Sequence, residues 1–455
     1  MFKTTSTLKS PRPEITRRSL GVLLALAATS LLSSTIAAQE RDAGSGRWLR
    51  LGDLYSNVRR ESPRVEAARA LARAAEARIP SSRLPPDPQL QVGFMNYSIP
   101  GLRPMDPLGM TQLQLMQMVP VAGKLSLSGR VTSAQANAQR ERASEVEWEV
   151  RAQAAMAFYE LYQIDQGLVV ARESLRLLAE LQRTAEAMYR VGEGRQPDVL
   201  RAHVEIARMT EDTIRMRTMR TAMSARLVAL LNRAAEMTVA SPVLPAFPDS
   251  LPALQALVAA AEHGRPMVKA GEHELNAADA GARLARREVW PDLTLGVQYG
   301  QRTAEMGTER MGSLMVGASI PIFARSRQLL MREEANAMQA MARADLAAMR
   351  ADTRGRVAQA YADLTRARSL VGLYRRTVLP QAEASVTSSL AAYRVGAVDF
   401  MTALDNRMTV NRYRQELFVL EAGEGKAWAE LEMLLGRELF DPFTLRNDEG
   451  TGDAR

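Results

Sequence analysis

The chain has 455 residues, a formal net charge of +8 and no cysteine, and only 5% of its residues are aromatic. A composition rich in Ala, Arg, Leu, Met and Glu favours long helices over a compact mixed core. The lack of cysteine excludes a disulfide scaffold and thiolate metal sites. Residues 1–38 supply half of the net charge, since they hold five bases and one acid, so we expect no nucleic-acid partner.

Residues 1–38 have the pattern of a secretory signal peptide. Basic residues between Lys3 and Arg18 precede the apolar run Leu20–Leu32 and a small-residue end, Ile36-Ala37-Ala38. Such a leader is cleaved, here most simply before Gln39. A membrane anchor is the alternative, although the run is short for a spanning helix.

The rest of the chain is a duplicated unit. Four marks recur in one order at an offset of 201 to 205 residues: Pro63 and Pro266, Pro86-Asp87 and Pro291-Asp292, Pro120 and Pro321, and Tyr189–Gly192 and Tyr393–Gly396. Such self-similarity indicates an internal repeat. We predict repeats at residues 39–240 and 251–440, a proline-rich connector at 241–250 and a disordered tail at 441–455.

Each repeat contains two predicted strands, Gln89–Tyr97 with Thr111–Val119, and Leu293–Gly300 with Ser313–Ile320. One side of each strand is apolar, apart from Gln117, and the other carries small or amide-bearing residues without charge. This alternation over about ten residues is typical of a membrane β-barrel strand. The alternative is a soluble hairpin packed on the helices.

Four strands cannot close a barrel, and an open edge in lipid leaves backbone groups unpaired. The strands of several protomers are therefore required, and three protomers supply twelve, an even number within the known range.

A proline-free helix is predicted from Lys124 to Tyr189, which is roughly 100 Å at 1.5 Å per residue. From Val150 to Leu178 its apolar residues follow the 4-3 spacing of a coiled coil. The second repeat nearly reproduces this seam from Val357 to Val378, and Pro380 then predicts a kink.

The tetrapeptide Tyr-Arg-Val-Gly marks the tip of a helical hairpin in each repeat. Gly192 and Gly396 suit the left-handed conformation that ends a helix. Pro197 and Asp399 suit the start of the next helix, as a first-turn proline and a capping carboxylate.

The duplicated strand pairs, the paired long helices and the two Tyr-x-Val-Gly tips resemble the TolC-type outer-membrane efflux proteins, over residues 48–438. The junction Gln117–Leu125 is similar to the heavy-metal (cation) efflux branch of this family. The resemblance implies a mainly α fold with a membrane β-barrel. In this trimeric α/β-barrel, each protomer gives four barrel strands and long antiparallel coiled-coil helices from two structural repeats.

The resemblance also implies a function. The chain would be the outer-membrane channel of a tripartite efflux system in a Gram-negative bacterium, a passive exit duct for metal cations or small toxic compounds. The implied partners are two further copies (a homotrimer), the outer-membrane lipid, a periplasmic adaptor protein and an inner-membrane pump driven by protons. The alternatives are the duct of a type I protein-secretion system and a periplasmic coiled-coil structural protein without a pore.

The resemblance implies two kinds of site residue. The adaptor would dock at the tips, on Tyr189, Val191, Gly192, Tyr393, Val395 and Gly396. In relatives, two carboxylates in the second tip helix ring the periplasmic entrance, and their positions here are Thr402 and Asp405. Three Asp405 carboxylates near a threefold axis would favour cations, whereas the alternative is a solvated carboxylate.

No motif indicates catalysis or a cofactor, and we expect neither. The three histidines, His203, His263 and His273, lack metal-ligand spacing. Five methionines in or near the first strand pair suggest either a path for soft metals or ordinary gap-filling: Met95, Met105, Met110, Met116 and Met118.

Overall fold

The computed structural model describes residues 48–101, 103–105, 109–234, 238–304 and 307–445. The predicted signal peptide lies outside these residues. We consider the unit from Leu49 onward.

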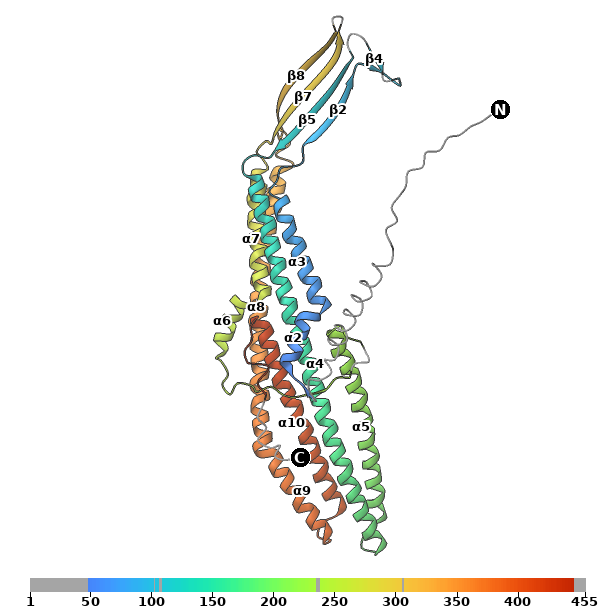
Figure 1. Ribbon diagram of the computed structural model, residues 1–455. Helices are drawn as coiled ribbons and strands as arrows, with labels where there is room; N and C mark the ends of the chain where they lie inside the picture. Colours follow the sequence, from blue (N-terminus) through green and yellow to red (C-terminus); the bar gives the residue numbers. More distant parts are fainter. Residues whose placement is uncertain (1–47, 102, 106–108, 235–237, 305–306, 446–455) are drawn as a thin grey trace, which may run out of the picture. The chain divides into compact units, whose positions relative to one another are not determined.

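The first repeat runs from helix to strands to helices (Figure 1). Its elements are β1 (Trp48–Leu49), α2 (Leu51–Glu61), α3 (Pro63–Ser81), β2 (Gln89–Met95), β3 (Tyr97–Ser98), β4 (Arg103–Pro104), β5 (Met110–Val119), α4 (Lys124–Arg190) and α5 (Gln196–Leu230).

The second repeat has the same order, after the two-residue strand β6 (Ser241–Pro242) in the connector. Its elements are α6 (Leu254–Gly264), α7 (Pro266–Arg287), β7 (Leu293–Ala304), β8 (Gly307–Ala318), α8 (Gln328–Leu373), the π-helical turn η1 (Tyr374–Val378), α9 (Leu379–Arg394) and α10 (Phe400–Leu435).

The long helix of the first repeat is confirmed as α4, a single helix of 67 residues. Its seam is buried, as the 4-3 spacing predicts, with Val150, Ala154 and Leu161 fully inaccessible. The seam of α8 is likewise buried at Val357 and Leu364. Because α4 is continuous, it separates the strands at its first residue from the tip at its last by roughly 100 Å.

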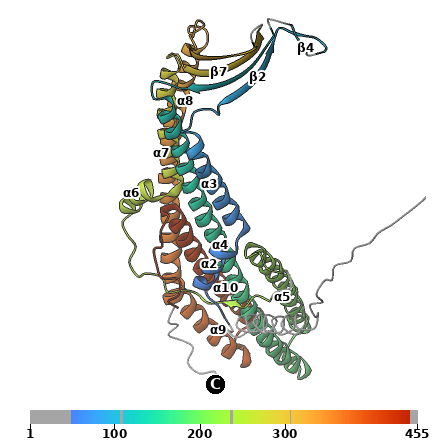
Figure 2. The ribbon, with the colours of Figure 1, turned by 45° about the horizontal axis from the view of Figure 1, so that its top comes forward.

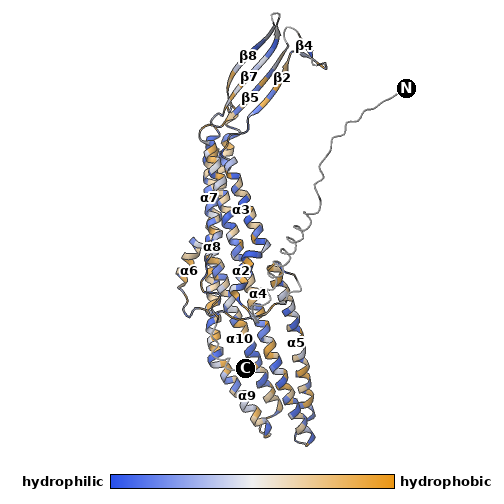
Figure 3. Cartoon of the chain, in the orientation of Figure 1, coloured by the Kyte–Doolittle hydropathy of each residue, from blue (hydrophilic) through white to orange (hydrophobic). Residues whose placement is uncertain are grey.

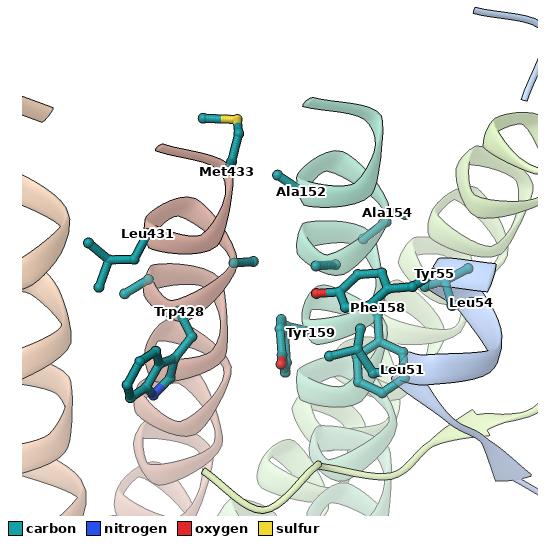
Figure 4. Close-up of a cluster of buried hydrophobic side chains, with 14 of the residues drawn as sticks. Leu51, Leu54, Tyr55, Ala152, Ala154, Phe158, Tyr159, Trp428, Leu431 and Met433 are labelled. Atoms are coloured by element: carbon teal, nitrogen blue, oxygen red, sulfur yellow. The ribbon is translucent and has the colours of Figure 1, made fainter. Parts of the chain in front are cut away.

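The largest core cluster lies where α4 and α10 pack together, with α2 beside α4 (Figure 4). Phe158 and Tyr159 of α4 meet at right angles, with ring centroids 5.2 Å apart. Trp428 of α10 is buried in the same cluster. The small residues Ala154 and Ala155 beside these rings let the helices approach closely.

A buried ion pair joins the two repeats. Arg265, at the N-terminus of α7, donates from Nε to Glu145 Oε1 of α4 at 2.9 Å. It also donates to Thr353 Oγ1 of α8, and Glu145 Oε2 accepts from the Met267 amide. Both charged side chains are almost inaccessible. Three helices from two repeats are therefore held by one satisfied polar cluster.

The four long strands form one antiparallel sheet in the order β2-β5-β7-β8 (Figure 2). Within the described residues, β2 and β8 each have a neighbour on one side only. The starts of β2, β5 and β7 are close to those predicted, but β7 ends four residues later than predicted and β8 begins six residues earlier, so both extend further into their shared hairpin. An Arg302–Glu309 ion pair across the two strands stabilises this extension.

The predicted kink at Pro380 is confirmed as an interruption of the helix. The π-helical turn η1 ends two residues before Pro380, which lies in the first turn of α9. Proline has no N–H to donate to the preceding turn, and here that turn is π-helical.

The prediction of a disordered tail from residue 441 is wrong for its first five residues. The Gly52 amide donates to Pro442 O, and the Ala246 amide donates to Thr444 O at 2.8 Å. Phe443 also lies so close over Gly52 that a Cβ there would clash. The ordered part of the second repeat therefore continues to Leu445.

Candidate functional site

The two helical tips have matching backbone hydrogen bonds. The Gly192 amide donates to Tyr189 O, and the Gly396 amide donates to Tyr393 O. The following residues, Glu193 and Ala397, donate five residues back in each case. Both glycines have positive φ, 82° and 74°, so the predicted left-handed helix ends are confirmed.

The same tetrapeptide is packed differently in the two tips. Val191 and Val395 are both exposed. Tyr189 is 48% exposed, whereas Tyr393 is only 5% exposed. Within the protomer Tyr393 is thus a packing residue. Its ring is not available at the surface for the predicted docking contact.

Tyr393 is buried because four helices converge at this end. Its ring meets Phe400 edge-on, with centroids 5.8 Å apart, in a cluster formed by α4, α5, α9 and α10. Burial and the nearby negative charge of Asp198 raise the pKa of the Tyr393 hydroxyl. Asp198 belongs to α5, so the first hairpin contributes to the environment of the second.

The predicted gate positions differ in their bonding. Asp399 is the N-cap of α10 and accepts from the Thr402 amide at 2.9 Å and from its hydroxyl. These two bonds, the hydroxyl first, lower the pKa of Asp399. Asp405 is exposed, and within the described part of the chain nothing hydrogen-bonds or pairs with its carboxylate. Of the two positions, Asp405 therefore presents a free negative charge.

A basic cluster near the second tip was not predicted. Arg414 of α10 donates to Glu173 of α4 at 2.9 Å and to Glu383 of α9 at 2.6 Å. The neighbouring Arg407 is half-buried, and burial together with the charge of Arg414 lowers its pKa. No local pattern could reveal the Arg414–Glu173 pair, since the two residues are 241 positions apart.

One face of the sheet is a continuous apolar surface that no described residue covers. Side chains alternate along each strand, and the observed register places the exposed apolar side chains side by side. They are Leu90, Val92, Phe94, Leu113, Leu115, Leu293, Leu295, Val297, Tyr299, Leu314 and Val316. Figure 3 shows hydrophobic and hydrophilic residues interspersed along the strands, as this alternation requires.

The opposite face carries amides and thioethers. Gln298 donates to Gln112 across β5 and β7 at 2.5 Å, and Gln114 Nε2 lies 3.9 Å from Met315 Sδ. The predicted strand segments carry no charge on this face, but the register puts the Arg302–Glu309 pair on it in the part of β7 and β8 that lies beyond their predicted bounds.

Methionines gather on this amide face alone. Four of the five predicted methionines, Met95, Met110, Met116 and Met118, lie there by register, and the second hairpin adds Met311 and Met315. Met105 follows β4 and lies off the four-stranded sheet. The described strand residues of the apolar face include no methionine. On the amide face Met116 and Met315 lie over Gly296, and Met110 lies over Gly300, as gap-filling residues do.

The base of the sheet is fixed by Lys124, the first residue of α4. Its Nζ lies 2.9 Å from Asp292 Oδ1 and donates to Trp290 O at the same distance. Asp292 also accepts from the Val121 amide. Lys124 thus holds a carboxylate of the second repeat, and this junction is built around an ion pair.

No cluster of three or more His, Asp or Glu side chains that could hold a metal ion occurs in the residues that the structure describes. Of the three histidines, His203 lies near Gln182 and Glu186 on the first tip hairpin. Among the described helices, none combines the length and apolarity needed to cross a bilayer.

The sequence matches the family model described as outer membrane efflux protein twice, at residues 54–233 and 257–437. The chain is similar to the cobalt-zinc-cadmium resistance protein CzcC of Cupriavidus metallidurans, with 24% identity over 68% of this chain and 73% of CzcC. It is also 24% identical to the outer membrane efflux protein BepC of Brucella suis, over 59% of each chain.

Solved structures show the same fold. The outer-membrane channel OprN superposes with a TM-score of 0.73 at 19% identity, covering 85% of this chain and 89% of OprN. CusC superposes with a TM-score of 0.72 at 18% identity, covering 85% of this chain and 92% of CusC. The twice-matched family model, together with the paired strands and the two helical tips, shows that this chain belongs to the outer membrane efflux protein family.

Proposed function

We propose that three copies of this chain form a continuous duct across the outer membrane and periplasm, serving a tripartite efflux system. The observation that carries this proposal is the exposed apolar face of a sheet with two open edges. A large exposed apolar patch on an exported chain marks a surface made for lipid or for a partner. The sheet as a whole then becomes one third of a barrel wall.

The open edges of β2 and β8 favour closure by further copies. Each unpaired backbone group in hydrocarbon costs several kcal/mol. If β8 of one protomer pairs with β2 of the next, three protomers give a closed barrel of twelve strands, an even number within the known range. The apolar face then meets lipid, and the amide and thioether face lines the lumen.

The dimensions of the second hairpin fit a bilayer. β7 and β8 have 12 residues each, which is roughly 40 Å of strand at about 3.3 Å per residue. At a tilt of about 45°, such strands span roughly 28 Å, close to the apolar band of outer-membrane barrels. Trp290 and Phe323, both exposed at the helix end of the sheet, suit the aromatic girdle at the membrane interface.

The helical tips are the proposed docking end for a periplasmic adaptor, through which the duct receives cargo from an inner-membrane pump. The exposed Val191 and Val395 beside Gly192 and Gly396 offer small apolar contacts to a partner. Tyr189 adds an exposed ring at the first tip, while Tyr393 supports the second tip from behind. Asp405, with Thr402 one turn away, lies on the second tip helix and would ring the entrance.

The cargo that we propose is a metal cation. The similarity to CzcC, a cobalt-zinc-cadmium resistance protein, supports this class. The thioethers and amides of the proposed lumen face are weak ligands for soft and borderline cations, so a cation could pass without being held. Small toxic compounds are the second candidate, because the similar protein BepC is described as an efflux protein without mention of a metal.

The proposal is tested with the purified full chain in planar bilayers and by fractionation of cells that express it. We expect outer-membrane localisation, a trimer, and stable single-channel conductance. A protein that fractionates with the soluble periplasm and conducts nothing would instead be a coiled-coil structural protein. Growth of a deletion strain on graded Co²⁺, Zn²⁺, Cd²⁺, Cu⁺ and Ag⁺, against a dye and a detergent, then separates the cargo classes.

A further inference from the structure

The internal repeat specifies how one protomer joins the next. The marks Pro86-Asp87 and Pro291-Asp292 set an offset of 205 residues for the first strand of each repeat, and Pro120 and Pro321 set 201 for the second. In the first hairpin Gln89 pairs with Met116. Adding 205 to the first residue number and 201 to the second gives the pair Thr294↔Gly317. The second hairpin has that pairing, so the offsets describe the structure as well as the sequence.

The joint between the repeats, β5 with β7, is therefore a template for the joint between protomers, β8 with the partner's β2. The template pairs Leu115 with Val297 and Leu113 with Tyr299. We infer that three copies pair β8 with the partner's β2 in this register, with Arg325 ion-paired to the partner's Asp87 at the base. Val316 then faces the partner's Val92, and Leu314 faces the partner's Phe94.

Side-chain sizes agree with this register. On the lumen face of the template, Met116 lies over Gly296, its Cγ 3.5 Å from where a Cβ would be. The converted register places Met315 opposite the partner's Gly93, again a methionine against a glycine. On the apolar face the same register places side chains that are each more than half exposed in the protomer opposite one another. Each of them thereby gains a cross-strand neighbour.

The ion pair follows from the same conversion. Lys124 and Asp292 form the pair at the base of β5 and β7, with only 7% and 21% of their side chains exposed. The residues at the equivalent positions are Arg325 and Asp87. Both are exposed, and within the described part of the chain neither has an ion-pair partner. Two unpaired opposite charges, at the two positions that the repeat relates to an existing pair, complement each other across the joint.

The helices below the sheet support the same joint. In the protomer α4 packs on α7, and the equivalent contact joins α8 to the partner's α3. The faces concerned carry large exposed apolar side chains, Met338 and Met341 on α8 and Leu71 on α3. The two joints differ at one point. Lys124 is the first residue of α4, whereas α8 begins at Gln328, so Arg325 lies in the turn before the helix. Arg327 is the nearest other cation that could pair with the partner's Asp87.

The test uses the absence of cysteine from the chain. In the double variant Val92→Cys/Val316→Cys, oxidation of the full-length protein in membranes should give covalent dimers and trimers on denaturing gels. The matched control is Val92→Cys/Met315→Cys, whose second thiol lies on the opposite face of the sheet, and which should stay monomeric. Either single variant controls for random collisions.

Charge reversal tests the ion pair separately. Asp87→Arg or Arg325→Asp alone should raise the dissociation constant of the trimer by about tenfold. The combined swap should bring it most of the way back. Arg327→Asp is the control variant and should not be rescued by Asp87→Arg.

The inference rests on the proposed trimer, so the oligomeric state of the unmodified chain in detergent is measured in parallel by light scattering. If that gives trimers but the Val92/Val316 thiols do not join, or if the charge swap restores nothing, the register and the ion pair are overturned while the duct stands. If no trimer forms, the proposed function and the inference fail together.

Discussion

Tyr189 and Tyr393 occupy equivalent positions in an identical tetrapeptide, yet the ring of Tyr393 is buried and that of Tyr189 is exposed. The difference arises from Phe400 and from α5, which cover the second tyrosine. The two tyrosines therefore have different roles within a protomer. The ring of Tyr189 is available to a partner, and the ring of Tyr393 packs among four helices.

This division predicts unequal effects of the same substitution. Tyr393→Ala should destabilise the tip by about 3–5 kcal/mol, because it leaves a cavity in a buried cluster. Tyr189→Ala should stay within about 0.5 kcal/mol, as expected for an exposed site. Hydrogen exchange of the tip amides measures both. Equal protection in the two variants would contradict the assignment of Tyr393 as the packing residue.

The buried pair between the repeats predicts a large loss on removal of one partner. Arg265→Met should cost about 3–5 kcal/mol, because it leaves the Glu145 carboxylate buried without its cation. The matched control is Arg142→Met, which removes the partly exposed pair with Glu274 and should cost less than about 1 kcal/mol. Chemical denaturation of the detergent-solubilised protein measures the difference, and similar costs for the two variants would argue against a stabilising role for burial.

The free carboxylate of Asp405 predicts cation preference. Asp405→Asn should lower the cation selectivity of the channel, because in the proposed trimer it removes a ring of three negative charges at the entrance. Reversal potentials in a salt gradient across a planar bilayer measure this. Glu193→Gln, at the exposed first tip, is the control with the same charge change. An Asp405→Asn channel with unaltered selectivity would mean that this carboxylate is simply solvated.

The N-cap of α10 predicts a pH dependence. Hydrogen bonds from Thr402 hold the folded-state pKa of Asp399 below its ordinary value of 3.8. The stabilisation is therefore fully present above that value and is lost as pH falls through the lowered pKa. A loss of hydrogen-exchange protection at the start of α10, measured against the intrinsic exchange rate at each pH, should appear on acidification in this window. In Asp399→Ser, which has an uncharged cap, it should not. If protection falls with pH in the same way in both proteins, the Asp399 cap does not cause the pH dependence.

The Arg414 bridge predicts a change in gating. Arg414→Ala removes the contacts of α10 with Glu173 and Glu383, so the second hairpin should separate more readily from α4. We expect a larger open fraction in single-channel recordings. Arg412→Ala is the control, because Arg412 is exposed and has only a distant ring contact with Tyr413. An unchanged open fraction would show that the bridge does not restrain the tip.

Periodic features could be predicted from the sequence, because periodicity is local. The seam of α4, the starts of β2, β5 and β7 and the glycine-ended tips all follow from spacing within one segment. The hairpin of β7 and β8 was predicted too short, since Arg302 and Glu309 are polar and their pairing becomes visible only across the strands.

The side-chain networks could not be predicted, because their members meet only after the helices pack. Glu145 and Arg265 are 120 residues apart, and Arg414 and Glu173 are 241 apart. The unequal burial of two identical tetrapeptides is a further case, as nothing in Tyr-Arg-Val-Gly itself distinguishes the two copies.

The ion pair of Lys124 with Asp292 has a consequence for assembly. In a ring of three duplicated chains, six similar joints alternate, and every second joint lies within one polypeptide. Those three joints form at the high effective concentration of a tethered segment. Of the other three, two bring separate chains together and must overcome the loss of translational freedom, and the last closes within the assembled arc. Gene duplication would thus have lowered the number of encounters needed to close the ring from five to two, which favours closed rings over open arcs at low protein abundance.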